Sequence, residues 1–403
     1  MITEKYDSRS PAELSVLASF DFQSRPRLIF GLNSVERVGE LAKELPAKNI
    51  LLVTDAGIVM AGHADHVRKI LETEKLSVFV FDQVLENPTT RCVDRCVAFA
   101  KANQIDAIVG LGGGSSMDTA KGCNFLLTNG GEMKDYWGVG KATKPMLPLM
   151  AIPTTAGTGS ECQSAALIAD EVTHQKMACL DPKAAARVAI LDPALTLSQP
   201  PRVTACTGID AIAHALETAV STKRNPVSML YSHEAFRLTT ANFAKVLQNP
   251  RDLVARGQML LGAAFAGTAI ENSMLGAAHS AANPLTAHYG IIHGQAVGMI
   301  LPHVVRFNGE QAEAQTNYAN LAQMAGISSA PDQRTRWLDL IDWIKSTLNL
   351  AEMPQSLQEF GVEASQISCL AEEAARQWTA KFNPRQVEKA DFVRIFESAL
   401  ASR

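Results

Sequence analysis

Short apolar runs alternate with amphipathic segments along the first half of the chain. Five runs are apolar at nearly every position, namely 49–54, 77–81, 106–111, 146–152 and 187–191. Between them, segments such as 35–45 and 90–103 place apolar residues at helical spacing. Strands that are apolar throughout and separated by helices indicate parallel pairing in a sheet that is covered on both faces. We therefore predict a Rossmann-like, doubly wound α/β layer.

The pattern changes after Pro200 and Pro201. From Thr204 onward the chain shows long Ala- and Leu-rich helical patterns and no convincing strand. Two glycines in the segment 259–270 and the turn-rich stretch 283–294 blur the helical pattern locally. We predict two domains, an α/β domain over 1–199 and an all-helical domain over 200–403.

Composition narrows the class of protein. The 403 residues carry a formal net charge of −4, which argues against a nucleic-acid partner. The longest apolar run, 259–270, is shorter than the roughly 20 residues of a membrane-spanning helix, so we expect no membrane partner. The beginning of the sequence shows no secretory signal, and the seven cysteines are scattered and odd in number. These features favour reduced thiols and a cytoplasmic location.

A glycine-rich loop follows the apolar run 106–111. The segment 106–121 reads DAIVGLGGGSSMDTAK, so three glycines precede two serines and a helical pattern. Glycines allow close approach of the backbone to a ligand, and the free N–H groups of a helix N-terminus attract phosphate. Alternatively, the loop is only a tight turn, with Ser115 and Asp118 forming a capping box. The segment lacks the full GxGxxG and P-loop patterns, and we interpret it as a site for a phosphate-bearing ligand.

A second loop and one acidic residue extend this interpretation. The stretch 153–161, PTTAGTGSE, supplies hydroxyl groups and backbone donors at the end of another apolar run. Two such loops favour a dinucleotide, although a simple Thr/Gly loop is the alternative. Asp55 ends the run 49–54 and can accept hydrogen bonds from a ribose while repelling a 2′-phosphate. It can equally cap the following turn. We expect NAD, with NADP less favoured.

The helical half contains residues suited to a metal. Asp210 and His214 are four positions apart, so a helix places both on one face. His279 and His293 add two imidazoles, 14 positions apart. One carboxylate and three imidazoles suit Fe, Zn, Co or Ni, and an open coordination position makes such a metal a Lewis acid. The alternative is a set of hydrogen-bonded core histidines.

Several motifs together resemble one known family. GGGSSMDTAK, PTTAGTGSE, DAIAHALE and the segments around His279 and His293 are similar to the iron-containing (group III) alcohol dehydrogenases, of the lactaldehyde reductase and 1,3-propanediol dehydrogenase type. The similarity runs nearly end to end and also includes RLIFG, ENPT at 86–89, AILDPALT at 189–196, LPHVVRFN at 301–308 and NPR at 383–385. This resemblance implies a dehydroquinate synthase-like architecture.

The resemblance also implies a role for individual residues. A divalent metal, Fe²⁺ or Zn²⁺, is expected on Asp210, His214, His279 and His293. The pyrophosphate of NAD is expected on the loop Gly112, Gly113, Gly114, Ser115 and Ser116, with Asp118 near the nicotinamide. The remaining expected cofactor contacts are Thr154, Thr155 and Thr158 along the cleft, Asp55 and Asn87 near the adenosine ribose, and Lys176.

The chain departs from the family pattern at one position. Many relatives have a histidine four residues after the third ligand, where it is a candidate proton relay, and this sequence has Asn283. Asparagine orients ligands by hydrogen bonding but does not shuttle protons near neutral pH. His288 is a candidate substitute, as are a ribose hydroxyl and water. Both residues are retained as candidate catalytic residues.

The expected activity follows from the family. We expect reversible oxidation of a primary alcohol or short diol to its aldehyde by hydride transfer to NAD. We expect the protein to be a homodimer that acts on small molecules. One alternative is a hydroxyacid–oxoacid transhydrogenase, in which the cofactor stays bound. A dehydroquinate synthase-like lyase and a non-catalytic nucleotide-binding protein are further alternatives.

Overall fold

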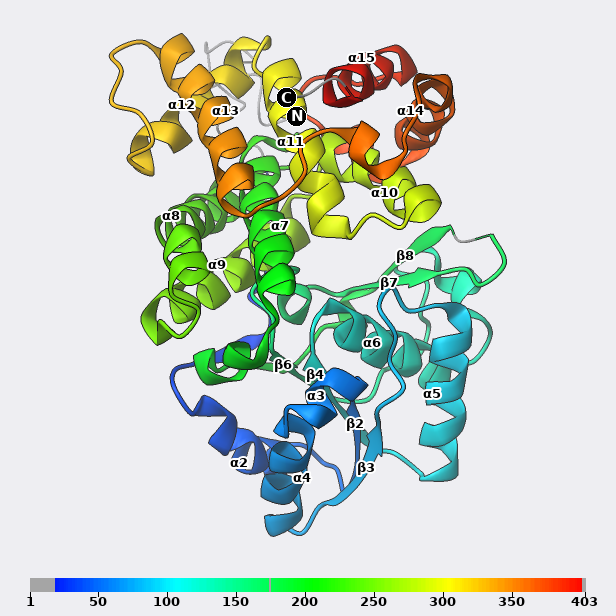
Figure 1. Cartoon of the computed structure of the whole chain (residues 1–403). Helices are drawn as coiled ribbons and strands as arrows, with labels where there is room; N and C mark the ends of the chain where they lie inside the picture. The colour runs from blue at the N-terminus through cyan, green and yellow to red at the C-terminus, as the bar shows by residue number, and fades with distance from the viewer. Residues whose placement is uncertain (1–18, 174, 401–403) are drawn as a thin grey trace, which may run out of the picture.

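A six-stranded parallel sheet forms the centre of the first half of the chain (Figure 1). The computed structural model describes residues 19–173 and 175–400. The strand order is β1-β9-β6-β4-β2-β3, and every neighbouring pair is parallel. The strands are β1 (Arg27–Phe30), β2 (Asn49–Val53), β3 (Ser77–Phe81), β4 (Ala107–Gly112), β6 (Leu149–Pro153) and β9 (Val188–Leu191). The five strands predicted from apolar runs are confirmed, and β1 is an additional edge strand.

Helices cover both faces of this sheet. They are α2 (Val38–Lys43), α3 (Ala56–Met60), α4 (His63–Thr73), α5 (Thr90–Ala102) and α6 (Gly114–Asn129). Along β2, Leu51 and Val53 point to the core formed with α5 and α6, whereas Ile50 and Leu52 point to the core formed with α2 and α4. The strand is apolar throughout because both of its faces are buried. The predicted doubly wound layer is confirmed.

A second, three-stranded sheet lies beside α6. Its order is β5-β8-β7, with β7 and β8 antiparallel, and its strands are β5 (Gly138–Val139), β7 (Ala165–Ala169) and β8 (Lys176–Leu180). The sequence pattern did not predict this sheet, because β5 is two residues long and β7 is mostly alanine. Its consequence for the site is that β8 begins at Lys176.

The second half of the chain is helical. Its helices are α7 (Pro201–Val220), α8 (Pro226–Gln248), α9 (Leu253–Asn272), α10 (Ala277–Tyr289), α11 (His293–Asn308), α12 (Ala312–Met324), α13 (Gln333–Leu350), α14 (Ile367–Arg376) and α15 (Lys389–Leu400). Helix α7, green in Figure 1, packs against α8, α9 and α11. Over the described range 201–400 the regular elements are all helical, as predicted.

The features that blurred the helical pattern have physical explanations. Helix α9 continues through Gly267, where a Cβ atom would lie 2.2 Å from the carbonyl oxygen of Gly159. The glycine therefore permits a close crossing between α9 and the loop after β6. The expected turn at 283–294 is wrong for most of its length, because α10 continues through Pro284 to Tyr289 and α11 begins at His293.

Helix α9 is also apolar enough to resemble a membrane span. Its mean hydropathy over an 18-residue window is 1.3, and 72% of that window is buried in the structure. Core helices of this kind are apolar all round because they pack on every side. Packing against α7 and α8 accounts for the composition of α9.

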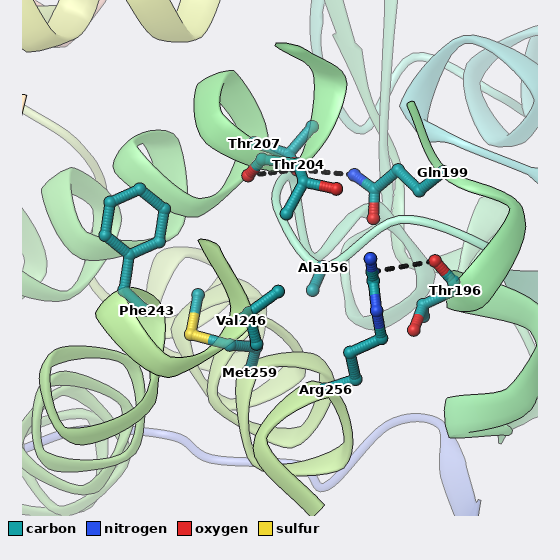
Figure 2. Close-up of a pocket in the computed structure, with 9 residues that line it drawn as sticks. All are labelled: Ala156, Thr196, Gln199, Thr204, Thr207, Phe243, Val246, Arg256 and Met259. Carbon is teal, nitrogen blue, oxygen red and sulfur yellow. Dashed lines mark hydrogen bonds between the residues drawn. The ribbon is translucent and has the colours of Figure 1, made fainter. Parts of the chain in front are cut away.

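The two halves are joined by polar contacts around a small cavity (Figure 2). Buried Arg256 on α9 donates a hydrogen bond of 2.7 Å to the carbonyl of Thr196, in the segment that precedes α7. Gln199 donates one of 2.8 Å to the hydroxyl of Thr207 on α7. The cavity measures about 10 Å³, enough for a single water at most. It therefore belongs to the junction and is too small for a substrate.

Candidate active site

A cleft of about 800 Å³ separates the sheet from the helical half. One wall is formed by residues that follow the carboxyl ends of β2, β4 and β6, and the other by α7, α10 and α11. In the sheet, β2 and β4 are neighbours. The strand after β2 in the chain, β3, lies on the far side of β2, whereas the next strand of this sheet after β4, β6, lies on the far side of β4. Open α/β sheets bind ligands at such a reversal of direction, so the topology itself marks this cleft as the site.

The glycine-rich loop forms the turn between β4 and α6. Gly112 has φ +143°, and a Cβ atom there would lie 2.4 Å from the hydroxyl of Ser116. A Cβ on Gly114 would lie 2.8 Å from Cγ2 of Thr158, across the cleft wall. Both positions therefore need glycine for the turn to pass so close to its neighbours.

The first turn of α6 is open to the cleft. The helix begins at Gly114 with Gly113 as its N-cap, and no side chain caps it. The alternative prediction of a capping box by Ser115 and Asp118 is wrong, because Ser115 already lies inside the helix. Gly113, Gly114 and Ser115 line the cleft. Uncapped N–H groups and the positive end of the helix dipole make this turn suitable for a phosphate.

A buried lysine ties the second loop to α6. Lys121 donates hydrogen bonds of 2.6 Å to the carbonyl of Ser160, 2.9 Å to its hydroxyl and 3.0 Å to the carbonyl of Ala165. The hydroxyl of Ser160 in turn donates a bond of 3.0 Å to Asp118. Burial raises the pKa of Asp118, and the nearby charges of Lys121 and Lys176 oppose this rise. The carboxylate of Asp118 is thereby fixed at the edge of the cleft.

Asp55 caps a helix and also lies at the cleft. Its Oδ1 accepts a hydrogen bond of 3.1 Å from the backbone of Ile58 and caps α3, and the residue also lines the cleft. Asn87 lines the same end of the cleft with φ +51°, in the left-handed region that asparagine tolerates. The threonines of the second loop line the cleft as well; they are Thr154, Thr155 and Thr158.

Three helices bring the four predicted metal ligands together. Asp210 and His214 share one face of α7, His279 lies in the first turn of α10, and His293 is the first residue of α11. One ligand atom each from Asp210, His279 and His293 lies within 4.8 Å of the others. Nε2 of His279 is 3.3 Å and Nε2 of His214 is 3.5 Å from Oδ1 of Asp210. The rings of His214 and His279 stack with centroids 4.7 Å apart.

The charge state of this cluster suits a divalent cation. Burial raises the pKa of Asp210, but the surrounding imidazoles outweigh it and hold the pKa well below its ordinary value. Burial lowers the pKa of His214 to about 4 and that of His293 to about 3, so both are neutral at pH 7. Nδ1 of each is buried and has no hydrogen-bond partner within residues 19–173 and 175–400. Burial also disfavours the charged form of His279, but the carboxylates of Glu217 and Asp210 outweigh it and raise its pKa to about 9. A carboxylate and imidazoles are the donor set of Fe²⁺ and Zn²⁺ sites, and a cation in this cluster would compete with the second ring proton of His279, so the residues present fit the metal.

Comparison with known proteins agrees with this geometry. The model of the family described as iron-containing alcohol dehydrogenase matches residues 25–193, and the model of its C-terminal region matches residues 204–400. The chain belongs to the iron-containing alcohol dehydrogenase family. Its class as an alcohol dehydrogenase and the predicted metal dependence are thereby confirmed.

Relatives in this family align over most of their length. Alcohol dehydrogenase 4 of Schizosaccharomyces pombe is 34% identical over 372 residues, which cover 92% of this chain and 87% of that protein. NAD-dependent methanol dehydrogenase of Bacillus methanolicus is 34% identical over 381 residues, covering 93% and 98%. The crystal structure of a 1,3-propanediol oxidoreductase has a TM-score of 0.92 and 32% identity, covering 95% of this chain and 100% of that chain. The fold prediction is confirmed.

The structure does not bring every predicted residue of this alcohol dehydrogenase to the cleft. Gly112 and Ser116 lie beneath the loop and shape it, because Ser116 is fully buried and contacts Asp55 at 3.5 Å. Asn283 donates a bond of 3.0 Å to Gln377. His288 is exposed and pairs with Glu373 at 2.8 Å. Neither Asn283 nor His288 lines the cleft, so their positions give no support to the catalytic role predicted for them.

Sequence reasoning also missed residues that organise the site. Lys121 follows Asp118 by three positions, so the two side chains are neighbours on a helix. This spacing could have indicated that Lys121 belongs to the site. Glu217 follows Asp210 by seven positions on the same face of α7 and contacts His279. Leu275, Ile270 and Ile292 line the cleft near the metal ligands, and only the fold places them there.

Proposed function

We propose that this enzyme interconverts an uncharged primary alcohol or short diol and its aldehyde, with NAD as hydride acceptor. The observation that carries the proposal is one cleft with an uncapped helix N-terminus on one wall and the cluster of Asp210, His214, His279 and His293 on the other. The metal, when bound, supplies a Lewis acid toward substrate oxygen, and the nicotinamide supplies the hydride chemistry.

The residues of the chain position the reactants. The turn Gly113–Ser115 holds the pyrophosphate through backbone N–H groups, and the threonines of the second loop, Thr154, Thr155 and Thr158, border the dinucleotide. Lys176 and Asp118 lie between this wall and the metal cluster, where they fix the nicotinamide end. Holding the alcohol carbon next to the hydride acceptor supplies much of the rate enhancement in such reactions.

The adenosine end of the cleft favours NAD over NADP. Asp55 and Asn87 line this end, and a carboxylate accepts hydrogen bonds from the two hydroxyls of a ribose. A 2′-phosphate placed there meets a negative side chain. Asp55 is held in position by its bond to the backbone of Ile58, so it does not turn away at low cost.

The metal end of the cleft favours an uncharged substrate. An apolar part of the cleft wall next to the metal ligands is formed by Ile270, Leu275 and Ile292. Among the described residues that line the cleft, Lys176 is the only Lys or Arg, and it lies close to the carboxylates of Asp118 and Asp210. A sulfonate or carboxylate on the substrate therefore finds no unpaired Lys or Arg side chain among the described lining residues, so the loss of its hydration is not compensated by an ion pair with the protein.

The location and assembly of the enzyme are part of the proposal. Six of the seven cysteines are buried and all seven are free thiols, which supports a reducing compartment such as the cytoplasm. Family resemblance supports a homodimer. Light scattering after gel filtration measures the mass, and a monomer at micromolar concentration contradicts the homodimer.

An assay of NADH formation over a substrate panel tests the proposed function. Purified enzyme with Fe²⁺ or Zn²⁺ is given ethanol, 1-butanol, 1,3-propanediol and a sulfonate-bearing alcohol, each with NAD and with NADP. We expect NADH to accumulate with the uncharged alcohols and much less product with the sulfonate or with NADP. Turnover that requires a 2-oxoacid and releases no NADH identifies the transhydrogenase instead.

A further inference from the structure

Glu217 makes two hydrogen bonds to the helix that carries His279. It is 4% exposed and lies on α7, on the face that also carries Asp210. Its Oε1 accepts a bond of 2.7 Å from the backbone N–H of Ala278, and its Oε2 lies 2.5 Å from Nδ1 of His279. One carboxylate therefore contacts both the backbone and the imidazole in the first turn of α10.

We propose that Glu217 is a positioning residue that fixes the tautomer and orientation of His279 for metal binding. This inference rests on the proposed metal site. A carboxylate at Nδ1 accepts the ring proton there and keeps it, so Nε2, which lies 3.3 Å from Oδ1 of Asp210, is the nitrogen available to a metal. Ligating histidines in proteins commonly donate their other N–H to a carboxylate, and loss of that partner lowers metal affinity 10- to 100-fold.

The start of α10 is built to receive this carboxylate. Its N-cap is Gly276, which offers no side chain to the free N–H groups of the first turn. Glu217 bonds the N–H of Ala278 instead, and Asn383 accepts a bond of 3.2 Å from that of Ala277. A Cβ on Gly276 would lie 2.9 Å from Oδ1 of Asn383 and 3.2 Å from Oε1 of Glu217. Glycine therefore leaves room for both acceptors.

The other imidazoles of the cluster have no equivalent support. Nδ1 of His214 and Nδ1 of His293 are buried without a hydrogen-bond partner in the part of the chain that the structure describes. His279 is also central, because its ring lies 4.7 Å from that of His214 and 5.4 Å from that of His293. Rotation of His279 therefore disturbs the whole donor set.

The variant Glu217→Gln tests the proposal with little change in size. The amide oxygen of glutamine can accept a hydrogen bond from only one of the two partners. If the oxygen faces His279, the NH₂ group meets the N–H of Ala278. If the oxygen faces Ala278, the NH₂ group donates to Nδ1 of His279 and favours the wrong tautomer. Asn383→Ala is the matched control, since it removes the neighbouring cap of α10 without contacting His279. Metal affinity of the stripped proteins is measured with Zn²⁺ and Co²⁺ by competition with a chromophoric chelator.

We expect Glu217→Gln to bind both metals 10- to 100-fold more weakly than the wild type, with an altered Co²⁺ absorption spectrum. Asn383→Ala should lower the melting temperature of the metal-free protein while its metal affinity stays within about threefold, because a lost cap acts on the helix and not on the ligand. Equal affinity in wild type and Glu217→Gln overturns the inference. Absence of metal binding by the wild type instead overturns the proposed function.

A second measurement on the wild type covers the case in which Glu217→Gln does not fold. The protein is loaded with ¹¹³Cd²⁺ and labelled with ¹⁵N-histidine, and coupling between metal and ring nitrogen is recorded by NMR. We expect His279 to show coupling to Nε2 and a proton on Nδ1. Coupling to Nδ1 overturns the assignment of Glu217.

Discussion

Glu161 is a buried acid whose ionisation opposes folding. It lies in the short 3₁₀ turn Ser160–Cys162, which packs on α9, and it is 2% exposed. Its Oε1 has no hydrogen-bond partner among the residues that the structure describes. Burial raises the pKa of Glu161 from 4.5 to about 7, while its own backbone N–H and the charge of Lys121 act in the opposite direction. The folded protein therefore binds this proton more tightly than the unfolded chain does.

The sign and size of the effect follow from this difference in pKa. Below pH 4.5 the carboxyl is neutral in both states, and between pH 4.5 and 7 only the unfolded chain loses its proton, so stability falls as pH rises. At about 1.36 kcal/mol per pH unit, the loss reaches about 3 kcal/mol above pH 7 and about 1 kcal/mol at pH 5. With an unfolding entropy of about 2.1 cal/mol/K per residue over 403 residues, the difference of about 2 kcal/mol corresponds to about 2 °C.

The substitution Glu161→Gln removes the titration and keeps the shape. Melting temperatures of wild type and variant are measured by scanning fluorimetry at pH 5 and pH 8. We expect the melting temperature of the variant relative to the wild type to rise by about 2 °C between these pH values. Glu397→Gln, at an exposed position on α15, is the control and should show no such trend. If the difference in melting temperature between Glu161→Gln and the wild type is the same at both pH values, the reasoning is refuted.

Three further substitutions test the cofactor wall. Gly114→Ala places a Cβ 2.8 Å from Thr158, so KM for NAD should rise about tenfold or more in steady-state assays, and an unchanged KM contradicts the phosphate site. Lys121→Met leaves the carbonyls of Ser160 and Ala165 without their hydrogen-bond donor. We expect a loss of roughly 3 kcal/mol, which lowers the melting temperature by about 4 °C. A melting temperature equal to that of the wild type contradicts the structural role of Lys121. Asp55→Asn should raise kcat/KM with NADP relative to NAD about tenfold, and an unchanged ratio removes Asp55 from cofactor selection.

Much of the fold could be predicted because its elements carry strong local patterns. The buried strands of the large sheet are continuous apolar runs. The four candidate metal ligands are conspicuous because they are polar side chains within apolar helical segments. Strand β1 was not recognised, since both of its end residues, Arg27 and Phe30, are exposed. Strands β7 and β8 are stabilised by pairing with each other, which a local pattern does not reveal.

The site itself depends on contacts between distant residues. The spacing of Asp210 and Glu217 indicates that they share one face of α7, but it does not identify the residue that Glu217 contacts. That residue, His279, is 62 positions away in the sequence. Asn283 and His288 were interpreted from their closeness in sequence to His279. Their side chains are held instead by Gln377 and Glu373, which lie 94 and 85 positions away. Family resemblance gives a residue its position, but tertiary partners decide where its side chain points.

The central claim is that one cleft joins a dinucleotide and a divalent metal on Asp210, His214, His279 and His293. The most direct measurement follows NADH formation from a primary alcohol by protein stripped with a chelator, before and after addition of Fe²⁺ or Zn²⁺ without oxygen. We expect turnover to vanish on stripping and to return with metal, and His279→Ala to neither bind metal nor recover. Full turnover by the metal-free protein, or by His279→Ala, contradicts the account.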